Sequence, residues 1–261
     1  MASPVTANAT ARADAPSAHW RAALRLAAIA GWLLICLVPH YLSKLTGRSH
    51  WPRRFLSGTA RLAGADVRLE GCRPGAGELL IANHVSWLDI PVLAGATGCA
   101  FVSKAEVRGH PFLKWIADQN HTLYVDRSQR RDIQAQAAMV RNGLSRGQPL
   151  AVFPEGTVGD GGRLLPFKPA LLAAVTPPPD GATVRPVAID YQGTATMFAW
   201  RPGEHGVANF FRVLGRKGRI PVTVRMLDVL PPHADRKTLA RTAHDAIAIA
   251  LAPSGIAPAA L

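Results

Sequence analysis

The feature that most constrains the fold of this chain is the alternation of short apolar runs with segments of helical periodicity. The apolar runs are rich in β-branched and aromatic residues, which is typical of buried strands. Strands that alternate with helices indicate an α/β fold, in which a largely parallel mixed sheet is flanked by helices. The predicted strands are DVRLE (66–70), ELLIA (78–82), CAFVS (99–103), TLYVD (122–126), PLAVF (149–153), VRPVAID (184–190) and VTVRMLDVL (222–230).

Two of the other segments place apolar residues along one face of a helix. We expect both faces to pack in the core and to carry no function of their own. The residues concerned are Ile133, Ala137, Val140 and Leu144 in the first helix, and Leu239, Ala243, Ile247 and Leu251 in the second.

An apolar segment near the N-terminus predicts contact with a membrane. Residues 22–42 are broken only by Arg25 and His40, and a helix of this length would reach about 30 Å, roughly the thickness of a bilayer core. A half-inserted helix or a buried core helix is the alternative, because the uninterrupted apolar stretch is shorter. The predicted organisation is a disordered tail (1–19), a hydrophobic membrane-anchoring helical segment (20–48) and one catalytic domain (49–261).

The charge balance predicts an anionic partner. Lysine and arginine number 30 against 17 acidic residues, giving a formal net charge of +13, and such an excess favours a membrane surface, a nucleic acid or a phosphorylated substrate. Because only 7% of the residues are aromatic and no stacking motif is present, we expect an anionic membrane surface and no nucleic acid. The cations that closely follow the apolar segment favour the cytoplasmic face, as of a bacterial inner membrane. They are Lys44, Arg48, Arg53 and Arg54.

Polar clusters follow three of the predicted strands. NHVSWLD follows ELLIA, Asp126 and Arg127 follow TLYV, and PEGT follows LAVF. In an open parallel sheet, ligands bind at the carboxyl edge, where the loops after the strands converge. If the three strands are parallel, the sequence therefore predicts a site that gathers His, Asp, Arg and Glu side chains at one edge.

The first cluster combines a helix start with a candidate acid–base pair. Ser86 and Asp89 have the spacing of a capping box, with Ser86 as the N-cap of a helix that runs to about Thr97. Capping leaves His84 without a role. On one continuous helix His84 and Asp89 would lie about 140° apart, but a carboxylate in the first helical turn can fold back onto a histidine in the preceding turn. Such a pair lets the imidazole remove a proton from a hydroxyl while the carboxylate fixes its tautomer.

The third cluster is favourable for a type I turn over residues 153–156, with Pro154 at the second position and Gly156 at the fourth. Turn formation explains these two residues but not Glu155. Arg127, in the second cluster, is suited to a structural ion pair or to binding a phosphate or carboxylate.

Taken together, NHVSWLD, YVDR, FPEGT and RPVAI, in this order and at these intervals, resemble the four sequence blocks of the glycerolipid acyltransferase family typified by 1-acylglycerol-3-phosphate acyltransferase. The likeness covers roughly residues 50 to 230. The first and third blocks are highly specific in combination, whereas the other two alone carry little information. The predicted catalytic domain is then an acyltransferase domain.

The resemblance implies transfer of a fatty acyl group from acyl-CoA or acyl-carrier-protein to the hydroxyl of a lysolipid, in membrane lipid biosynthesis. It implies that His84 and Asp89 are the catalytic pair, with His84 removing the proton of the acceptor alcohol and no covalent enzyme intermediate. Neither a metal nor a cofactor is implied beyond the acyl thioester co-substrate. The residues implied to hold the acceptor headgroup are Arg127, Glu155, Gly156 and Thr157.

Two departures from the family pattern concern the acceptor. Val158 stands where phosphate-recognising members usually carry an arginine, and residues 120–122 stand where a glycine is usual. The form FPEGT-x-GDG resembles that of branches that acylate other lysolipids, including lyso-ornithine lipid. The acceptor therefore stays open between 1-acylglycerol-3-phosphate and a related lysolipid.

Three alternatives compete with this interpretation. GLSRG (143–147) matches the GxSxG pattern of serine hydrolases, with Ser145 as nucleophile, but it ends a helix and leads into a strand, which is the reverse of a nucleophile elbow. A metal site built from histidines and Asp89 matches no standard ligand spacing, and the three cysteines form no CxxC pair. A basic membrane-binding protein without catalysis is the third alternative, and it would show no activity.

Overall fold

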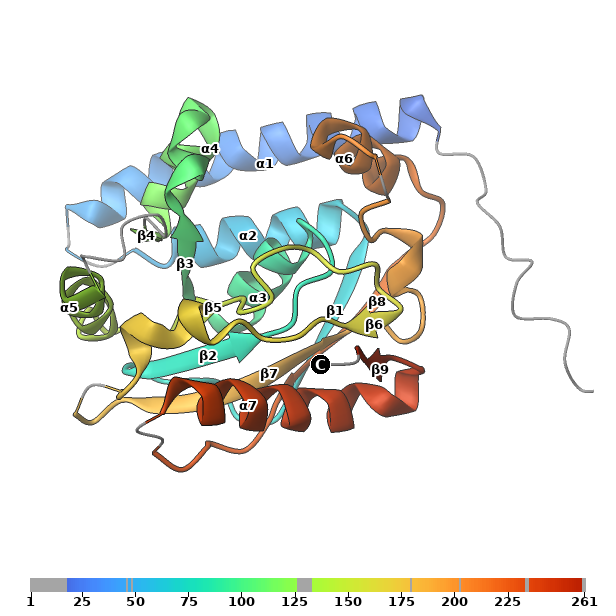
Figure 1. Ribbon diagram of the computed structural model, residues 1–261. Coiled ribbons are helices and arrows are strands. Elements are labelled where there is room, and N and C mark those ends of the chain that lie inside the picture. The colour runs from blue at the N-terminus through green and yellow to red at the C-terminus, as the bar shows by residue number, and fades with distance from the viewer. Residues whose placement is uncertain are drawn as a thin grey trace, which may run out of the picture.

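A seven-stranded sheet forms the centre of the protein, with helices on both faces (Figure 1). The computed structural model describes residues 18–45, 47, 49–125, 133–178, 180–201, 203–232 and 235–259. The strand order is β1-β8-β7-β2-β5-β3-β4. The strands are β1 (Ala65–Glu70), β2 (Glu78–Ala82), β3 (Ala100–Lys104), β4 (Leu123–Val125), β5 (Leu150–Val152), β7 (Thr183–Asp190) and β8 (Ile220–Met226), and a separate small sheet pairs β6 (Arg163–Leu164) with β9 (Ala257–Pro258).

The sheet is largely parallel, which confirms the predicted fold class. β2 runs parallel to β7 and β5, β5 to β3, and β3 to β4. The direction reverses between β7 and β8, which pair antiparallel, and β1 runs parallel to β8. The carboxyl ends of β2, β3, β4, β5 and β7 therefore lie at one edge of the sheet, whereas those of β1 and β8 lie at the other.

All seven predicted strands are present, but the last one is shorter than predicted. β8 ends at Met226, whereas the apolar pattern continues to residue 230. Beyond β8 the chain stays bonded to β7 through the N–H groups of Leu227 and Leu230, yet only an isolated bridge forms there, between Leu230 and Val184. Apolar alternation therefore does not report where the regular ladder ends.

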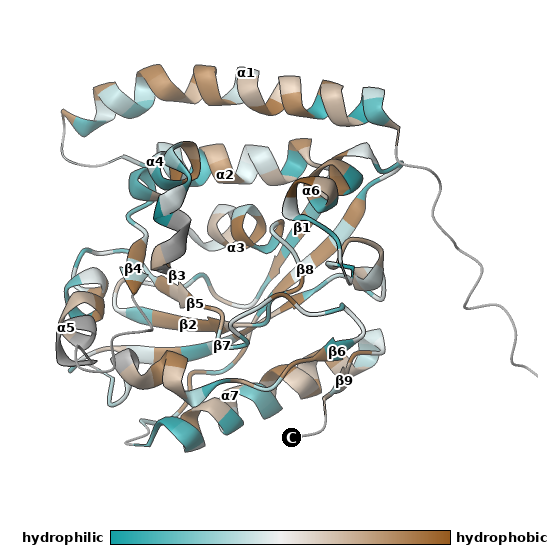
Figure 2. Cartoon of the chain, turned by 45° about the horizontal axis from the view of Figure 1, so that its top comes forward, coloured by the Kyte–Doolittle hydropathy of each residue, from teal (hydrophilic) through white to brown (hydrophobic). Residues whose placement is uncertain are grey.

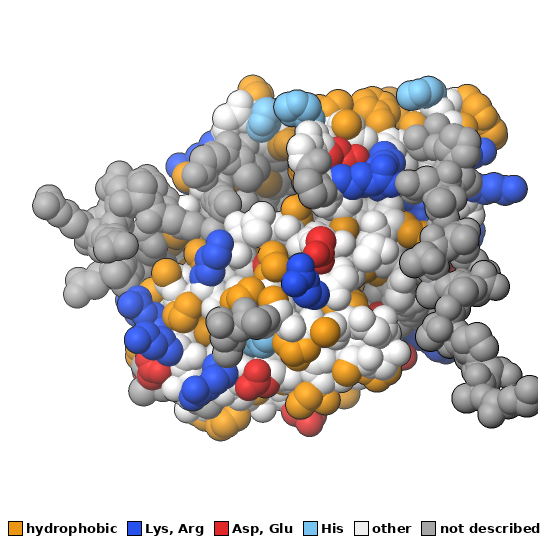
Figure 3. Space-filling view, turned by 45° about the vertical axis from the view of Figure 1, so that its right-hand side comes forward, with side chains coloured by type: hydrophobic (Ala, Val, Ile, Leu, Met, Phe, Trp, Pro, Cys, Tyr) orange, Lys and Arg blue, Asp and Glu red, His pale blue; other side chains and the backbone are white. Residues whose placement is uncertain are grey.

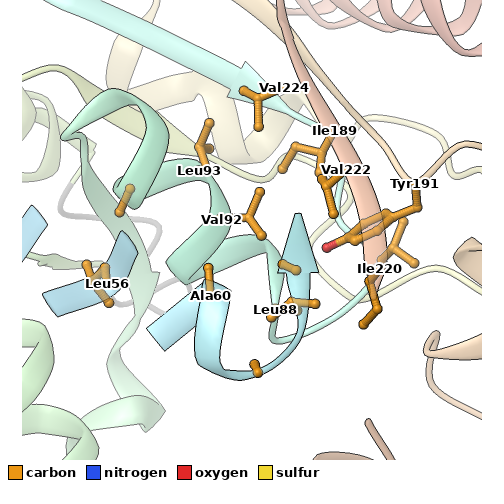
Figure 4. Packing of buried hydrophobic residues seen from close by; sticks show 14 of the residues in the cluster. Leu56, Ala60, Leu88, Val92, Leu93, Ile189, Tyr191, Ile220, Val222 and Val224 are labelled. Carbon is orange, nitrogen blue, oxygen red and sulfur yellow. The ribbon is translucent and has the colours of Figure 1, made fainter. Parts of the chain in front are cut away.

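The two faces of the sheet carry separate hydrophobic cores. In β2, Leu80 and Ala82 face one core, while Leu79 and Ile81 face the other. The first core lies under α1 (His19–Lys44), α2 (Trp51–Leu62), α3 (Asp89–Thr97) and α6 (Gly206–Gly215), and Figure 4 shows part of it. The second lies under α5 (Ile133–Leu144), α7 (Arg236–Leu251) and the short 3-10 helix η3 (Pro169–Val175), while α4 (Pro111–Gln119) follows β3.

The predicted helical stripe of α7 is confirmed, and that of α5 is confirmed at the two residues whose side chains are described. All four stripe residues of α7 are buried, as are Val140 and Leu144 of α5. The side chains of the remaining two α5 residues lie outside the description.

Helix α1 packs along the outside of α2 and α6 (Figure 2). The indole N–H of Trp32 donates to the carbonyl of Phe55 over 3.2 Å. The ring occupies the space left by Gly58, where an added Cβ would come within 2.0 Å of it. Arg25 donates to the carbonyl of Leu214 over 2.9 Å, at the C-terminal end of α6, where a cation also interacts favourably with the helix dipole. The helix is thus fixed to the domain at more than one point.

The outward face of α1 is apolar and exposed. The helix is 26 residues long with a hydropathy of 2.0 over its most apolar window, of which only 11% is buried, so it is not a buried core helix. In Figure 3, hydrophobic side chains gather along the upper edge, at the level of α1 in Figure 1. The apolar residues of this helix and its C-cap that are each at least 60% exposed are Trp20, Leu24, Leu34, Ile35, Val38, Leu42 and Leu45.

The predicted disordered tail (1–19) lies almost wholly outside the described residues. Its last residue, His19, is already the first residue of α1.

Candidate active site

The turn after β2 is held by Asn83, the first residue beyond the strand. Its side-chain N–H donates to the carbonyl of Ile189 over 3.0 Å, and its carbonyl accepts the N–H of Ile189 over 2.8 Å. The amide side chain thus continues the pairing of β2 with β7 for one more step. These two hydrogen bonds fix the direction in which the chain leaves β2, so the next residue, His84, lies at the carboxyl edge of the sheet.

His84 and Asp89 form a hydrogen-bonded pair. The Nδ1 of His84 lies 2.8 Å from Oδ2 of Asp89, so the carboxylate reaches back from the first turn of α3, as the sequence led us to expect. An ionised carboxylate can only accept hydrogen bonds, so Nδ1 carries the proton. Nε2 is therefore the unprotonated nitrogen and the one able to accept a proton.

Asp89 is fully buried and accepts hydrogen bonds at both oxygens. Oδ2 also accepts the backbone N–H groups of Val85 (2.6 Å) and Ser86 (2.8 Å), while Oδ1 accepts the hydroxyl of Tyr191. Burial without such donors would be strongly unfavourable for a carboxylate. The donors hold Asp89 in one orientation at the start of α3.

The predicted capping box is only half formed. Asp89 does accept from the N–H of Ser86, but the Ser86 hydroxyl accepts the N–H of Leu88, over 3.4 Å, and the helix begins at Asp89 with Leu88 as its N-cap. The reason is that Asp89 is engaged with the turn before the helix, so residues 86–88 form that turn. The helix ends at Thr97 as predicted.

His84 faces an open cleft with a volume of about 840 Å³. Its ring stacks on Phe153, with centroids 4.3 Å apart and planes 17° apart, and its side chain is 17% exposed. Ile90 is 40% exposed and lines the cleft. The other residues that line the cleft are Phe101, Val102, Ser103, Gly156, Thr157, Val158, Gly159, Asp160, Leu165, Trp200 and Arg201.

Glu155 is buried behind the cleft wall and bonded to backbone. The predicted turn is present, since Gly156 N–H donates to the carbonyl of Phe153 over 3.2 Å. The carboxyl of Glu155 accepts the N–H of His84 over 2.6 Å and that of Leu165 over 3.3 Å. Burial raises the pKa of Glu155 to about 8, against the lowering effect of these two hydrogen bonds. Glu155 is 2% exposed and thus reaches the backbone of the turn after β2, not the cleft.

The other predicted binding residues are placed differently. Gly156 and Thr157 line the cleft, and Gly156 has a φ of 72°, which only glycine adopts readily. Arg127 and Asp126 lie outside the described residues.

A second polar cluster holds the loop that carries Trp200 and Arg201. Arg212 of α6 donates to both carboxylate oxygens of Glu204, over 2.7 and 2.8 Å, and Asn209 donates to the same carboxylate over 3.0 Å. The indole N–H of Trp200 donates to the Glu204 carbonyl over 2.6 Å. Arg212 lowers the pKa of Glu204 to about 2. We call Glu204, Asn209 and Arg212 the loop brace.

Tyr191, Trp200 and Arg201 are among the residues of the site that sequence reasoning missed. Tyr191 directly follows β7, so the strand-end rule that found the other clusters could have found it. Trp200 and Arg201 follow the short helix η4 (Ala195–Met197), and no local pattern marks them as cleft residues.

The alternative sites receive no support from the geometry. Ser145 follows α5 and leads toward the amino end of β5, whereas His84 lies at the carboxyl edge. Its hydroxyl donates to the carbonyl of Arg141 over 3.0 Å. Within the described part of the chain, no group of three or more His, Cys, Asp or Glu residues is arranged to hold a metal ion.

The comparisons with known proteins all lead to acyltransferases. A family model described as Acyltransferase matches residues 66–190. The lyso-ornithine lipid O-acyltransferase of Pseudomonas aeruginosa is 36% identical over 74% of this chain and 76% of its own length. The 1-acyl-sn-glycerol-3-phosphate acyltransferase of Neisseria gonorrhoeae is 38% identical over 56% of this chain and 58% of its own length.

The fold has a counterpart among solved structures. The crystal structure of the 1-acyl-sn-glycerophosphate acyltransferase of Thermotoga maritima superposes with a TM-score of 0.56, at 20% identity, over 87% of this chain and 94% of that one. The exposed apolar α1 of this chain indicates membrane association. The Pseudomonas relative, at 36% identity, covers 74% of this chain. This chain therefore belongs to the acyltransferase family and is an acyltransferase.

Proposed function

We propose that the protein transfers a fatty acyl group from an acyl-CoA or acyl-carrier-protein thioester to the hydroxyl of a lysolipid, in membrane lipid biosynthesis. The observation that carries the proposal is His84, held by Asp89 through Nδ1 and facing a cleft of about 840 Å³. The names of the sequence relatives support the same class of acceptor.

The reaction proceeds in one transfer without a covalent enzyme intermediate. Nε2 of His84 takes the proton of the acceptor hydroxyl as its oxygen attacks the thioester carbonyl carbon. The carbon–sulfur bond then breaks, and the leaving thiolate takes the proton back from Nε2. Asp89 stabilises the imidazolium that exists between these two proton transfers.

Glu155 acts by positioning and not by binding the headgroup. Its carboxyl joins the N–H of His84 to the N–H of Leu165, and thereby ties the turn after β2 to the loop after β5. Glu155 is 2% exposed, so the substrate does not reach it. Gly156 and Thr157, which line the cleft, contact the acceptor, and Arg127 assists in holding its headgroup.

The acceptor is a lysolipid with a zwitterionic headgroup, and lyso-ornithine lipid is the candidate we favour. The described part of the cleft wall carries one acidic side chain, Asp160, and one cationic side chain, Arg201, and it presents an apolar side chain at Val158. An ornithine headgroup has an ammonium and a carboxylate to match these charges. A phosphate monoester would instead lie close to the like charge of Asp160, which its exposed ion pair with Arg163 over 3.7 Å neutralises only in part.

The protein works at the anionic cytoplasmic face of a membrane, as of a bacterial inner membrane. Helix α1 lies in the membrane surface as a monotopic helix, with its exposed apolar face in the lipid and its other face on α2 and α6. Its end is held by His40, which lies 2.9 Å from Gln119. Co-flotation with phosphatidylglycerol vesicles tests this placement, and the double variant Leu34→Glu, Ile35→Glu must lose it. Undiminished flotation of that variant would refute the placement.

A panel of acceptors and donors tests the reaction. Lyso-ornithine lipid and 1-acylglycerol-3-phosphate are each offered with acyl-CoA and with acyl-carrier-protein, and release of free thiol is measured together with the mass of the lipid product. We expect acceptor-dependent thiol release, a diacylated product and the highest kcat/KM with lyso-ornithine lipid. Acceptor-independent hydrolysis would favour the hydrolase alternative, and no thiol release with any pair would favour a non-catalytic membrane-binding protein.

A further inference from the structure

We propose that Tyr191 is a positioning residue of the catalytic pair, which fixes the Asp89 carboxylate so that the carboxylate in turn fixes the His84 ring. The inference rests on the proposed role of His84 and Asp89. Tyr191 does not line the cleft and is fully buried, so it acts through Asp89 and not on the substrate.

The contact comes from a neighbouring strand. Tyr191 directly follows β7, and β2 and β7 run parallel, so both strands end at the same edge. The phenol points toward the start of α3, near Val92 and Leu88 (Figure 4). There its hydroxyl donates to Oδ1 of Asp89. The pair thus becomes a chain of three groups, from Tyr191 through Asp89 to His84.

The donors of Asp89 are divided between its two oxygens. Oδ2 takes the three N–H groups of His84, Val85 and Ser86, over 2.6 to 2.8 Å. Oδ1 takes the phenol, the one donor found for it among the described residues. Without the phenol, the buried Oδ1 would stay unsatisfied, and only the donors to Oδ2 would oppose a turn of the carboxylate about its Cβ–Cγ bond. The phenol removes both problems.

The phenol stays a donor at working pH. Burial and the negative charge of Asp89 raise the pKa of Tyr191 well above its ordinary value. The ring is also held independently of Asp89, because it packs against Phe198 with centroids 4.5 Å apart. In addition, the Tyr191 carbonyl accepts both the N–H and the hydroxyl of Thr194, over 3.0 and 2.7 Å. Tyr191 is therefore fixed before it orients the carboxylate.

Tyr191→Phe tests the inference, because it removes one hydroxyl and keeps the ring. We expect kcat to fall at least about 10-fold, while KM for acceptor and donor stays within about twofold, since binding groups are untouched. In ¹⁵N NMR spectra of histidine-labelled wild-type protein, His84 should be a single Nδ1–H tautomer. In the Tyr191→Phe protein it should be a mixture of the two tautomers. A residue with only a structural role would lower the melting temperature and leave the tautomer unchanged.

Tyr124→Phe is the matched control. Its hydroxyl donates to the carboxylate of Asp118 over 2.9 Å, so the substitution removes the same type of hydrogen bond outside the catalytic pair. We expect kcat within about twofold of the wild type and an unchanged His84 tautomer. If Tyr191→Phe and Tyr124→Phe have equal kcat values, Tyr191 has no positioning role.

Two further measurements keep the inference separate from the proposed function. Activity retained by His84→Ala would refute the catalytic pair itself, whereas an inactive His84→Ala protein beside a fully active Tyr191→Phe protein would refute only the inference. If Tyr191→Phe does not fold, the three tyrosines are replaced by 3-fluorotyrosine, which keeps ring and hydroxyl. Tyr41→Phe and Tyr124→Phe each remove one ¹⁹F resonance, and the resonance that both variants keep belongs to Tyr191. That resonance must then shift with Asp89→Asn. No shift would overturn the inference.

Discussion

Two glutamates near the cleft, Glu155 and Glu204, show how differently the same side chain is used in two regions of this protein. Glu155 is buried and bonded to backbone N–H groups, and burial raises its pKa to about 8. Glu204 is paired with Arg212, which lowers its pKa to about 2. One carboxyl is therefore neutral or nearly so at pH 7, and the other is fully ionised.

The two shifts have opposite consequences for stability. The unfolded chain releases the Glu155 proton near pH 4.5 and the folded protein near pH 8, so this group contributes stability below pH 4.5 that is lost as pH rises toward 8. Glu204 contributes stability above pH 4.5 that is lost as pH falls toward 2. At pH 7 the buried Glu155, which joins the N–H of His84 to the loop after β5, therefore contributes less to the free energy of unfolding than it does at acid pH. The charged groups of the loop brace raise the free energy of unfolding at the same pH.

The largest expected effect is that of His84→Ala on activity. Removal of the imidazole deletes the general base, so kcat should fall about 10³-fold, while circular dichroism and cooperative unfolding stay those of a folded protein. The measurement is thiol release under saturating acceptor and donor. Normal turnover by His84→Ala would show that His84 is not the general base and that the turn after β2 is not the reactive region.

Arg212→Ala should have the next largest effect, and on stability. It leaves the carboxylate of Glu204 largely buried without its guanidinium, which costs about 3 kcal/mol of unfolding free energy. Because the loop with Trp200 and Arg201 loses its support, KM for the acceptor should rise more than kcat falls. Urea unfolding and steady-state kinetics measure the two effects.

Lys114→Ala is the matched control for the loop brace. Its ion pair with Asp118 is exposed, with 45% and 36% of the two side chains accessible, so the loss should stay below about 1 kcal/mol. Equal losses in the two variants would mean that the loop brace is no stronger than a surface ion pair.

Glu155→Gln should change how stability depends on pH. The wild type loses up to about 1.4 kcal/mol per pH unit between pH 5 and 8 through this group, and the neutral glutamine should flatten that slope. Urea unfolding at unit intervals from pH 5 to 8 measures it. Glu204→Gln serves as the control, because it should keep the pH dependence of the free energy of unfolding above pH 5 and change it only below that pH. Parallel slopes for wild type and Glu155→Gln would contradict the raised pKa.

The smallest expected effect is that of Ser145→Ala. The hydroxyl is exposed and bonded only to the carbonyl of Arg141 among its described contacts, so stability should change by less than about 0.5 kcal/mol and kcat should not change. Loss of activity in this variant would move the chemistry from the carboxyl edge of the sheet to the opposite one.

Local patterns predicted the fold and the contact between His84 and Asp89, whereas the catalytic role of the pair stays a prediction. The seven strands could be predicted because each is an apolar run bounded by turn residues, and His84 with Asp89 could be found because both flank the end of one strand. The helices α2, α4 and α6 were not predicted, although they cover the first core or follow β3. The reversal of direction at β8 was also not predicted, since a strand pattern contains no information about its neighbours.

Long-range contacts explain what the sequence could not provide. Tyr191 meets Asp89 across 102 positions, and Glu155 meets His84 across 71. Sequence reasoning therefore had no means to see that Glu155 points at the backbone of the first block.

The reversal of strand direction between β7 and β8 separates the loops of this protein into two sets with different evolutionary freedom. Loops that follow β2, β3, β5 and β7 border the cleft, so under the proposed function we expect changes there to alter which lipid is acylated. Loops that follow β1 and β8 leave the sheet at the far edge, together with the connections that enter the parallel strands. Insertions, surface charges or fused segments can accumulate on that edge while the chemistry is inherited unchanged.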